Sequence, residues 1–95
     1  MRWTTNTAIK TANYTAVGGD VVLCDPSGGT FTVTIPLASG TDRMIVIKNV
    51  TDSTTAITLA RTSSDTIDGA TSVTMNLARQ SVTMISNGSN GWMIT

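Results

Sequence analysis

Gln80-Ser-Val-Thr-Met-Ile-Ser86 alternates apolar and polar residues with the period of two that a half-buried strand requires. Asn87-Gly-Ser-Asn-Gly-Trp-Met-Ile94 follows at once, and it opens on a turn rich in Asn, Gly and Ser. Its last residues form a second short alternating run around Trp92. Strands and turns without a catalytic side chain among them indicate a small all-β protein.

The same alternation recurs upstream. Phe31, Val33 and Ile35 point to one side of a predicted strand over 30–35, and threonines point to the other side until Pro36 ends it. We expect further strands at about 20–24, 44–48, 55–59, 72–77, 80–86 and 92–95, and a loop over 60–71 in which Ile67 is an apolar plug. The turn signal Asp25-Pro-Ser-Gly-Gly29 makes 20–24 and 30–35 a predicted hairpin or neighbouring strands. Seven or eight short strands spaced in this way predict an antiparallel β-sandwich or small barrel.

A chain of 95 residues is one domain. Residues 13–95 form the predicted β domain, and residues 1–12 are an N-terminal arm or edge strand. We expect this arm to supply capsid or subunit contacts through Arg2, Trp3 and Ile9, although Trp3 folded back onto its own domain is an equal alternative. The expected core consists of the inward positions of the alternating runs: Val21, Leu23, Phe31, Val33, Ile35, Ile45, Ile47, Ile67, Val82, Met84, Trp92 and Ile94.

The charge of the chain is low and balanced. Only 13% of the residues are charged, against about 25% in typical soluble domains, and six Lys+Arg balance six Asp. This balance gives no field that attracts nucleic acid or an anionic membrane, so neither is an expected partner. The apolar runs are too short to span a bilayer, and the polar start of the chain shows no signal peptide. Production in a reducing cytoplasm is expected, since one cysteine, Cys24, makes no internal disulfide.

The residue inventory argues against an enzyme. The chain has no histidine, which removes the usual general base, the nucleophile pairs and most zinc sites. Cys24 lies within an apolar run and is expected to be a buried small hydrophobe. Asp65 and Asp68 are the one close pair of carboxylates, and aspartates in turns usually bond the backbone two residues on. We therefore expect no catalytic residue, no metal and no cofactor.

The run Thr30-Phe-Thr-Val-Thr34 raises an ice-binding alternative, because regular rows of threonine can match a lattice. That mechanism needs the row repeated on successive coils at a fixed period, and the sequence shows no such repeat. A polar outer face of a sheet is the interpretation that we prefer.

An ordered set of short motifs then suggests a family. It comprises Asn13-Tyr-Thr-Ala-Val17, Gly19-Asp-Val-Val-Leu-Cys-Asp25, Thr32-Val-Thr-Ile-Pro36, Ile45-Val-Ile-Lys-Asn49, Asp65-Thr-Ile-Asp-Gly-Ala70 and Ser86-Asn-Gly-Ser-Asn-Gly-Trp92. With this set the chain resembles, from about residue 13 to its end, a small β domain of tailed-bacteriophage virion proteins, which include capsid decoration proteins, head fibres and tail fibres. It departs from the pattern by an inserted Gly91 before Trp92 and by Arg79 near a turn that is usually rich in glycine.

The resemblance implies a structural and adhesive module that is usually trimeric and carries no activity. Because the chain has its own Met1 and no shaft repeat, we expect a capsid decoration (cement) protein. Its homotrimers would bind the major capsid protein on the outer surface of the head and stabilise the particle.

Three alternatives remain. A tail fibre or receptor-binding module would attach to a host surface glycan, usually through exposed aromatic residues beside Asp or Asn. A baseplate or tail adaptor would be present in a handful of copies per particle. A hydrolase of unknown type is the most distant.

Overall fold

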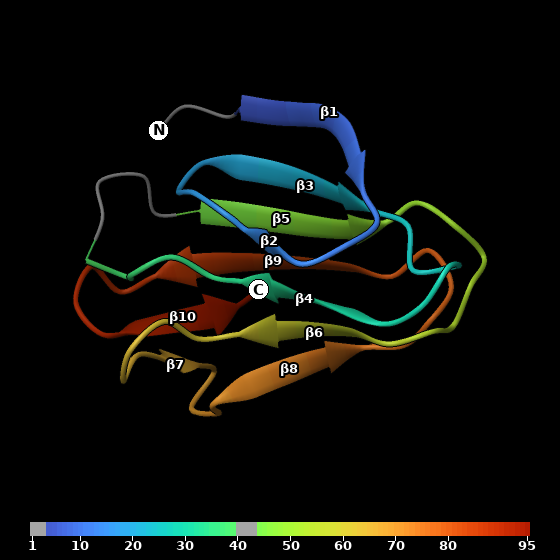
Figure 1. Cartoon of the computed structure of the whole chain (residues 1–95). Coiled ribbons are helices and arrows are strands. Elements are labelled where there is room, and N and C mark those ends of the chain that lie inside the picture. Colours follow the sequence, from blue (N-terminus) through green and yellow to red (C-terminus); the bar gives the residue numbers. More distant parts are fainter. Residues whose placement is uncertain (1–3, 40–43) are drawn as a thin grey trace.

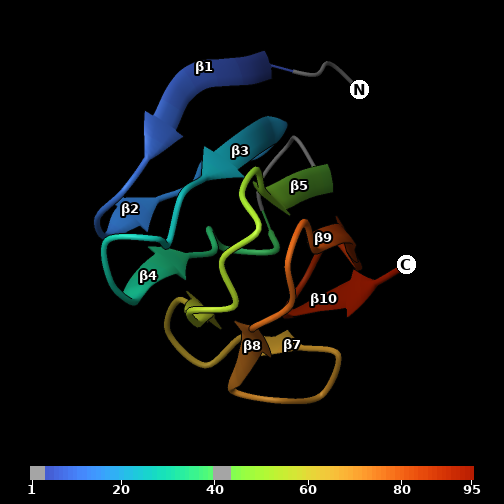
Figure 2. The same cartoon turned by 90° about the vertical axis from the view of Figure 1, so that its right-hand side faces the viewer.

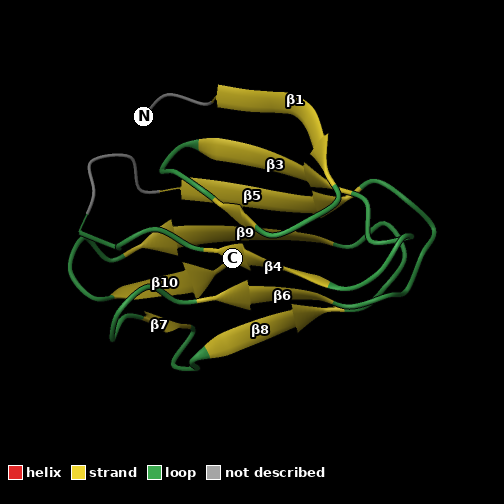
Figure 3. Ribbon diagram, viewed as in Figure 1, coloured by secondary structure: helices red, strands yellow, loops and turns green. Residues whose placement is uncertain are grey.

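The computed structural model of the protein describes residues 4–39 and 44–95. The described residues form strands and turns but no helix, which confirms the all-β class (Figure 3). Within these ranges, ten strands assemble into two sheets. The six-stranded sheet has the order β1 (Thr4–Lys10), β3 (Asp20–Cys24), β5 (Met44–Asn49), β9 (Ser81–Ser86), β10 (Gly91–Ile94) and β7 (Thr66–Ile67). The four-stranded sheet has the order β2 (Tyr14–Thr15), β4 (Phe31–Thr34), β6 (Ile57–Ala60) and β8 (Ser72–Met75).

The chain changes sheet at each connection from β1 to β9. Odd-numbered strands lie in the six-stranded sheet and even-numbered strands in the four-stranded sheet, until β9 and β10 follow each other in the same sheet. As a result, β1, β3 and β5 run parallel to one another, and so do β2, β4 and β6. The first six strands therefore wind as a flattened coil, each turn of which places one strand in each sheet (Figures 1 and 2).

The predicted antiparallel arrangement is therefore wrong for this half of the chain, and both sheets are mixed. In the described residues the antiparallel strand pairs are β5 with β9, β9 with β10, and β6 with β8, and an isolated antiparallel bridge joins Ile67 to Ala70. The expected pairing of 20–24 with 30–35 is also wrong, because β3 and β4 lie in different sheets. The turn at Asp25 carries the chain across: its Oδ1 accepts hydrogen bonds from the amide and the hydroxyl of Ser27, at 2.9 and 2.5 Å.

The coil is invisible in the sequence because its turns differ in length. Thr4 lies opposite Asp20 in the first parallel pair, whereas Val21 lies opposite Val46 in the next. Loops of unequal length absorb the difference, so the sequence shows no fixed period.

The sequence analysis gives an arm or an edge strand for residues 1–12. The described part of that range, Thr4–Lys10, forms an edge strand, β1.

The core lies between the sheets and takes residues from both. Inward and outward positions alternate along β3, β4, β5 and β6, as the pleat of a strand requires. The structure buries nine of the residues that were expected in the core, which are Phe31, Val33, Ile35, Ile45, Ile47, Ile67, Val82, Met84 and Trp92. The burial expected for Cys24 is confirmed, and the buried apolar residues that the sequence analysis did not predict are Ala16, Val22, Ala38, Ile57, Leu59 and Met75.

Val21, Leu23 and Ile94 do not belong to this core, so their assignment to it is corrected. Val22 and Cys24 are fully buried, while Val21 and Leu23 alternate with them and are only half-buried on the opposite face of β3. Ile94 is 37% exposed, since it lies at the end of β10 next to the chain terminus. Val21 and Leu23 thus lie on the outer face of the sheet, whereas Ile94 is exposed by its position at the strand end.

Candidate interaction surface

The outer face of the six-stranded sheet, which points away from the core, carries a continuous set of apolar side chains. We call this set the apolar stripe: Val21 and Leu23 on β3, Met44 and Val46 on β5, Ile85 on β9 and Met93 on β10. It runs obliquely over four neighbouring strands of the sheet.

Strand register brings these residues together. Met93 lies opposite Ile85, and Ile85 lies opposite Met44, which makes one row across three strands. Val46, two residues beyond Met44 on the same strand, lies opposite Val21. Directly opposed residues have Cβ atoms about 4.5–5.5 Å apart, so their side chains form one patch.

The apolar stripe is in contact with solvent. Ile85 is 39% exposed and Met93 is 41% exposed, and the other four residues are half-buried by their neighbours. Scattered exposed apolar residues are ordinary on a protein surface, but contiguous apolar patches usually mark a site of interaction.

The outer face of the four-stranded sheet has a different chemistry. Its rows, given by the register, are Thr32–Thr58–Thr74 and Thr15–Thr34–Ala60–Ser72; we call them the threonine face. Threonine suits an outward strand position because its β-branched carbon favours the extended backbone while its hydroxyl meets water. The polar outer face expected for Thr30–Thr34 is present, and the two outer faces of the molecule therefore differ in polarity.

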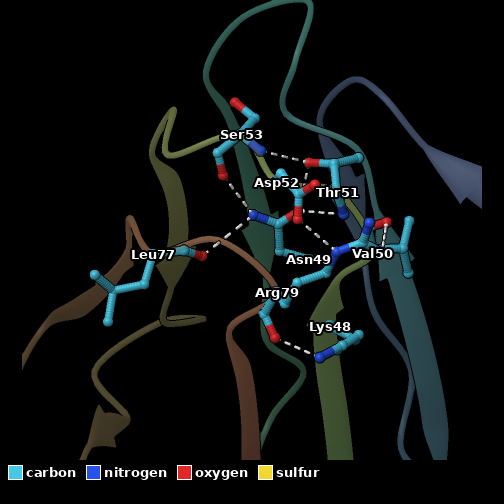
Figure 4. A network of polar contacts seen from close by, with 8 residues as sticks. All are labelled: Lys48, Asn49, Val50, Thr51, Asp52, Ser53, Leu77 and Arg79. Atoms are coloured by element: carbon cyan, nitrogen blue, oxygen red, sulfur yellow. Dashed lines mark hydrogen bonds and ion pairs between the residues drawn. The ribbon is translucent and has the colours of Figure 1, made fainter.

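Lys48 borders the apolar stripe and belongs to a polar network at the end of the coil (Figure 4). Its Nζ donates to the carbonyl oxygen of Arg79. Arg79 in turn donates from Nε to Asp52 at 2.9 Å and from Nη1 to the carbonyl oxygen of Val50 at 2.6 Å. The cations of this region are thus engaged with acceptors of the chain itself.

Asn49 is the buried centre of the same network. Its Nδ2 donates to the carbonyl oxygens of Ser53 and Leu77, at 2.9 and 3.3 Å. Its Oδ1 accepts from the amide and hydroxyl of Thr51, at 2.9 and 2.7 Å. All four hydrogen-bonding positions of the amide are used for structure, as the burial of a polar side chain demands.

The buried carboxylates also have structural roles. Asp20 Oδ2 accepts from the hydroxyl of Tyr14 at 2.9 Å and from the amide of Val17 at 3.1 Å. Asp65 Oδ2 accepts from the amide of Ala38 at 2.8 Å. Across residues 4–39 and 44–95, no group of three or more His, Cys, Asp or Glu residues could hold a metal ion.

Cys24 faces the core and is fully buried. Burial raises the pKa of its thiol to about 11, and the positive charge of Lys10 opposes part of this effect. A thiol held protonated in an apolar setting is a poor nucleophile and a poor metal ligand.

The two departures from the motif pattern have local explanations. Gly91 is buried against the Asn87 side chain, whose Oδ1 accepts from the amides of Ser89, Asn90 and Gly91 at 2.9–3.1 Å. Arg79 occupies the left-handed region at φ 58°, a conformation that favours glycine. Its side-chain hydrogen bonds to Val50 and Asp52 accompany this backbone conformation.

Of the three expected contact residues, the structure describes one. Ile9 is 51% exposed on the edge strand β1. Arg2 and Trp3 lie outside the described residues. The apolar stripe was missed because its members come from four strands, and sequence alternation identifies outward positions without showing which strands are neighbours.

Comparison with known proteins finds no family model that matches the chain and no match among curated proteins. The resemblance to phage virion proteins therefore stays a prediction. Within the described residues no helix is long and apolar enough to cross a membrane.

Proposed function

We propose that this protein is a non-enzymatic assembly module, and specifically a phage capsid decoration protein that binds the outer surface of the head as a homotrimer and stabilises it. The observation that carries the proposal is the unequal chemistry of the two outer faces. An apolar stripe on one face is suited to contacts between proteins, and a threonine face is suited to water.

The arrangement of strands supports a sandwich. Neighbouring strands are hydrogen-bonded within one sheet or the other, and the described residues form two separate strand orders. Side chains of both sheets share one core, as in a two-layer packing. A rigid two-layer block is a suitable unit for a coat, because it offers fixed faces to its neighbours.

Trimeric binding has a physical advantage for a coat protein. A trimer meets its lattice three times, so that individually weak contacts combine through effective concentration. The near-absence of net charge keeps repulsion between crowded copies small. The partner is the major capsid protein, and the location is the virion.

Glycan recognition has less support. Sugar stacking needs an exposed aromatic ring, and the aromatic residues in the described part of the chain are not exposed. Phe31 and Trp92 are buried, and Tyr14 is half-buried, with Lys10 Nζ 4.3 Å from its ring centroid. Nothing in the described residues favours the receptor-binding alternative.

The test is binding to undecorated phage heads. Purified protein is mixed with heads that lack it, and the heads are then sedimented and heated. We expect co-sedimentation in hundreds of copies per head and release of the genome at a higher temperature than for bare heads. Binding of a handful of copies would indicate a tail part instead, and absence of binding to the heads would contradict the proposal.

A further inference from the structure

We propose that Asn87 is a site of spontaneous deamidation, and that the turn between β9 and β10 sets the rate of this reaction by holding the amide of Gly88. The turn contains two Asn-Gly pairs, Asn87-Gly88 and Asn90-Gly91. Asparagine is a thermolabile residue, and a following glycine leaves its backbone nitrogen accessible because it has no Cβ to shield it. The sequence signal is the same in both pairs, and the fold makes them unequal. The reaction depends neither on capsid binding nor on trimer formation.

The reaction joins the backbone nitrogen of Gly88 to Cγ of Asn87. The nitrogen loses its proton to a base in the solvent, the bond from Cγ to Nδ2 breaks, and Nδ2 leaves as ammonia. Water then opens the cyclic succinimide at either carbonyl carbon. Opening at Cγ gives aspartate, and opening at the backbone carbonyl carbon gives isoaspartate, whose main chain runs through Cγ. Either product adds one negative charge to a chain of formal net charge +0.

Ser86 holds the proton that has to leave. The amide of Gly88 donates to Ser86 Oγ at 2.8 Å, and the Ser86 hydroxyl in turn donates to the carbonyl oxygen of Ala38. Ser86 is buried, so this acceptor has a fixed position. A serine hydroxyl is not a base, so the nitrogen keeps its proton for as long as the hydrogen bond lasts. The reaction therefore waits for a local opening of the turn.

The Asn87 side chain is otherwise well arranged for the attack. Its Oδ1 accepts from the amides of Ser89, Asn90 and Gly91 at 2.9–3.1 Å. Attack on Cγ places negative charge on this oxygen, and amide donors that are already in position stabilise such a charge. Asn87 is also exposed, so water and base can reach it. The release of the Gly88 amide is thus the step that the fold withholds.

Asn90-Gly91 is better protected, because its peptide group is part of the strand pairing. The amide of Gly91 donates to Asn87 Oδ1 at 3.1 Å, and Gly91 is buried. The carbonyl oxygen of Asn90 accepts from the amide of Thr66 at 3.0 Å, and that of Gly91 accepts from the amide of Asn87 at 2.9 Å. These bonds have to break before the Gly91 nitrogen can reach Cγ of Asn90, whereas Gly88 has to lose a single hydrogen bond to a side chain.

The two products of the reaction differ in their effect on the turn. Aspartate at position 87 keeps Oδ1 as an acceptor and adds charge to it, which strengthens hydrogen bonds from amide donors. Isoaspartate places Cγ in the main chain, so the turn gains a methylene group and the amides of Ser89, Asn90 and Gly91 lose their acceptor. We expect the isoaspartate form to unfold at a lower urea concentration than the aspartate form.

The experiment follows both Asn-Gly pairs in the native protein and in variants of Ser86. The proteins are kept at mildly alkaline pH, and peptide mapping by mass spectrometry measures aspartate and isoaspartate at positions 87 and 90 separately. We expect Asn87 to react faster than Asn90. Ser86→Ala should raise the rate at Asn87 about fivefold, which is the effect of one lost hydrogen bond on an opening equilibrium, and leave Asn90 unchanged. Ser86→Thr keeps the hydroxyl and should restore a rate close to the native one.

Ile57→Val is the control for overall stability, since it weakens the core on β6 at a residue outside the turn. It should leave both rates unchanged. A comparison in concentrated urea covers the case in which the Ser86 variants do not fold. There the native sequence should react equally at both positions, and faster than the folded protein does.

Several results would overturn the inference. One is a folded protein that reacts at Asn87 as fast as the unfolded chain, or that reacts first at Asn90. Another is a folded Ser86→Ala variant that reacts at Asn87 at the native rate. Equal acceleration of both positions by Ser86→Ala and by Ile57→Val would assign the control to global unfolding instead of the turn.

Discussion

Arg79 donates a hydrogen bond from Nε to Asp52 Oδ1 at 2.9 Å while its own backbone lies in the left-handed region at φ 58°. The two side chains are largely exposed, at 58% and 84% of their surface. An ion pair so open to water contributes little to stability, in the range of about 0–1 kcal/mol. The backbone conformation is therefore the larger effect at this position.

Replacing Arg79 by glycine should cost less than replacing it by alanine. Both changes remove the hydrogen bonds to Asp52 and Val50, but only glycine adopts a positive φ without strain. We expect Arg79→Gly to be more stable than Arg79→Ala by about 1 kcal/mol. Urea unfolding measures the difference, and an alanine variant that equals or exceeds the glycine variant in stability would contradict this account.

Asn49→Asp should destabilise the protein although it preserves the shape of the side chain. It replaces the donor Nδ2 by an oxygen that faces the carbonyl oxygens of Ser53 and Leu77. A buried carboxylate against two acceptors should cost about 2–4 kcal/mol at neutral pH. The loss should shrink in acid, because a protonated carboxyl can donate one of the missing bonds.

Asp52→Asn is the matched control, since it makes the reverse exchange at an exposed site in the same network. We expect a change of less than about 0.5 kcal/mol for it. Urea unfolding of both variants at neutral and acidic pH is the measurement. Equal losses in the two variants would show that the buried amide has no special role.

Gly91→Ala should weaken the turn between β9 and β10. An added Cβ would lie 3.3 Å from Asn87 Nδ2 and 3.5 Å from Thr66 Oγ1, so the Asn87 side chain would have to move. Because Asn87 Oδ1 holds three amides of this turn, we expect a loss of about 1–3 kcal/mol. Gly28→Ala serves as the control, since no atom lies within 4 Å of its added Cβ. A thermal melt in which both variants behave alike would refute the packing argument.

The Cys24 thiol should make stability depend on pH in the alkaline range. Burial raises the pKa of this thiol from 9.0 to about 11, so the folded protein holds its proton to higher pH than the unfolded chain does. The resulting contribution is complete below pH 9.0 and is lost as the pH rises toward about 11. Cys24→Ala removes this contribution, so its urea midpoint should decline less over that window than the midpoint of the native protein. Parallel declines in the two proteins would contradict the prediction.

The sequence was informative about local structure and silent about strand pairing. The alternation in Phe31–Ile35 defines which side chains face inward, and the turn residues mark where strands end. The run Val21-Val-Leu-Cys24 has no polar residue that shows which positions face inward, so Val21 and Leu23 were assigned to the core in place of Val22, although the burial of Cys24 was expected. Parallel pairing, as between Val21 and Val46, links segments that are distant in the chain and leaves no local signal.

The apolar stripe could not be predicted from the sequence for the same reason, because it depends on which strands are neighbours. Ile85 and Met93 each look like isolated apolar residues in their own strands, and only the register across β5, β9 and β10 joins them to Met44. The resemblance to virion proteins led to a functional proposal, and it gave no indication of which face takes part. Surface chemistry assembled from several strands needs the fold before it can be recognised.

The measurement that tests the central proposal most directly is the mass of the purified native protein in solution, by light scattering behind size exclusion. The account predicts a mass three times that of the 9.9 kDa chain, maintained on dilution through the micromolar range in which the protein is assayed. A mass of one chain at every concentration would contradict the trimer on which the proposed function rests.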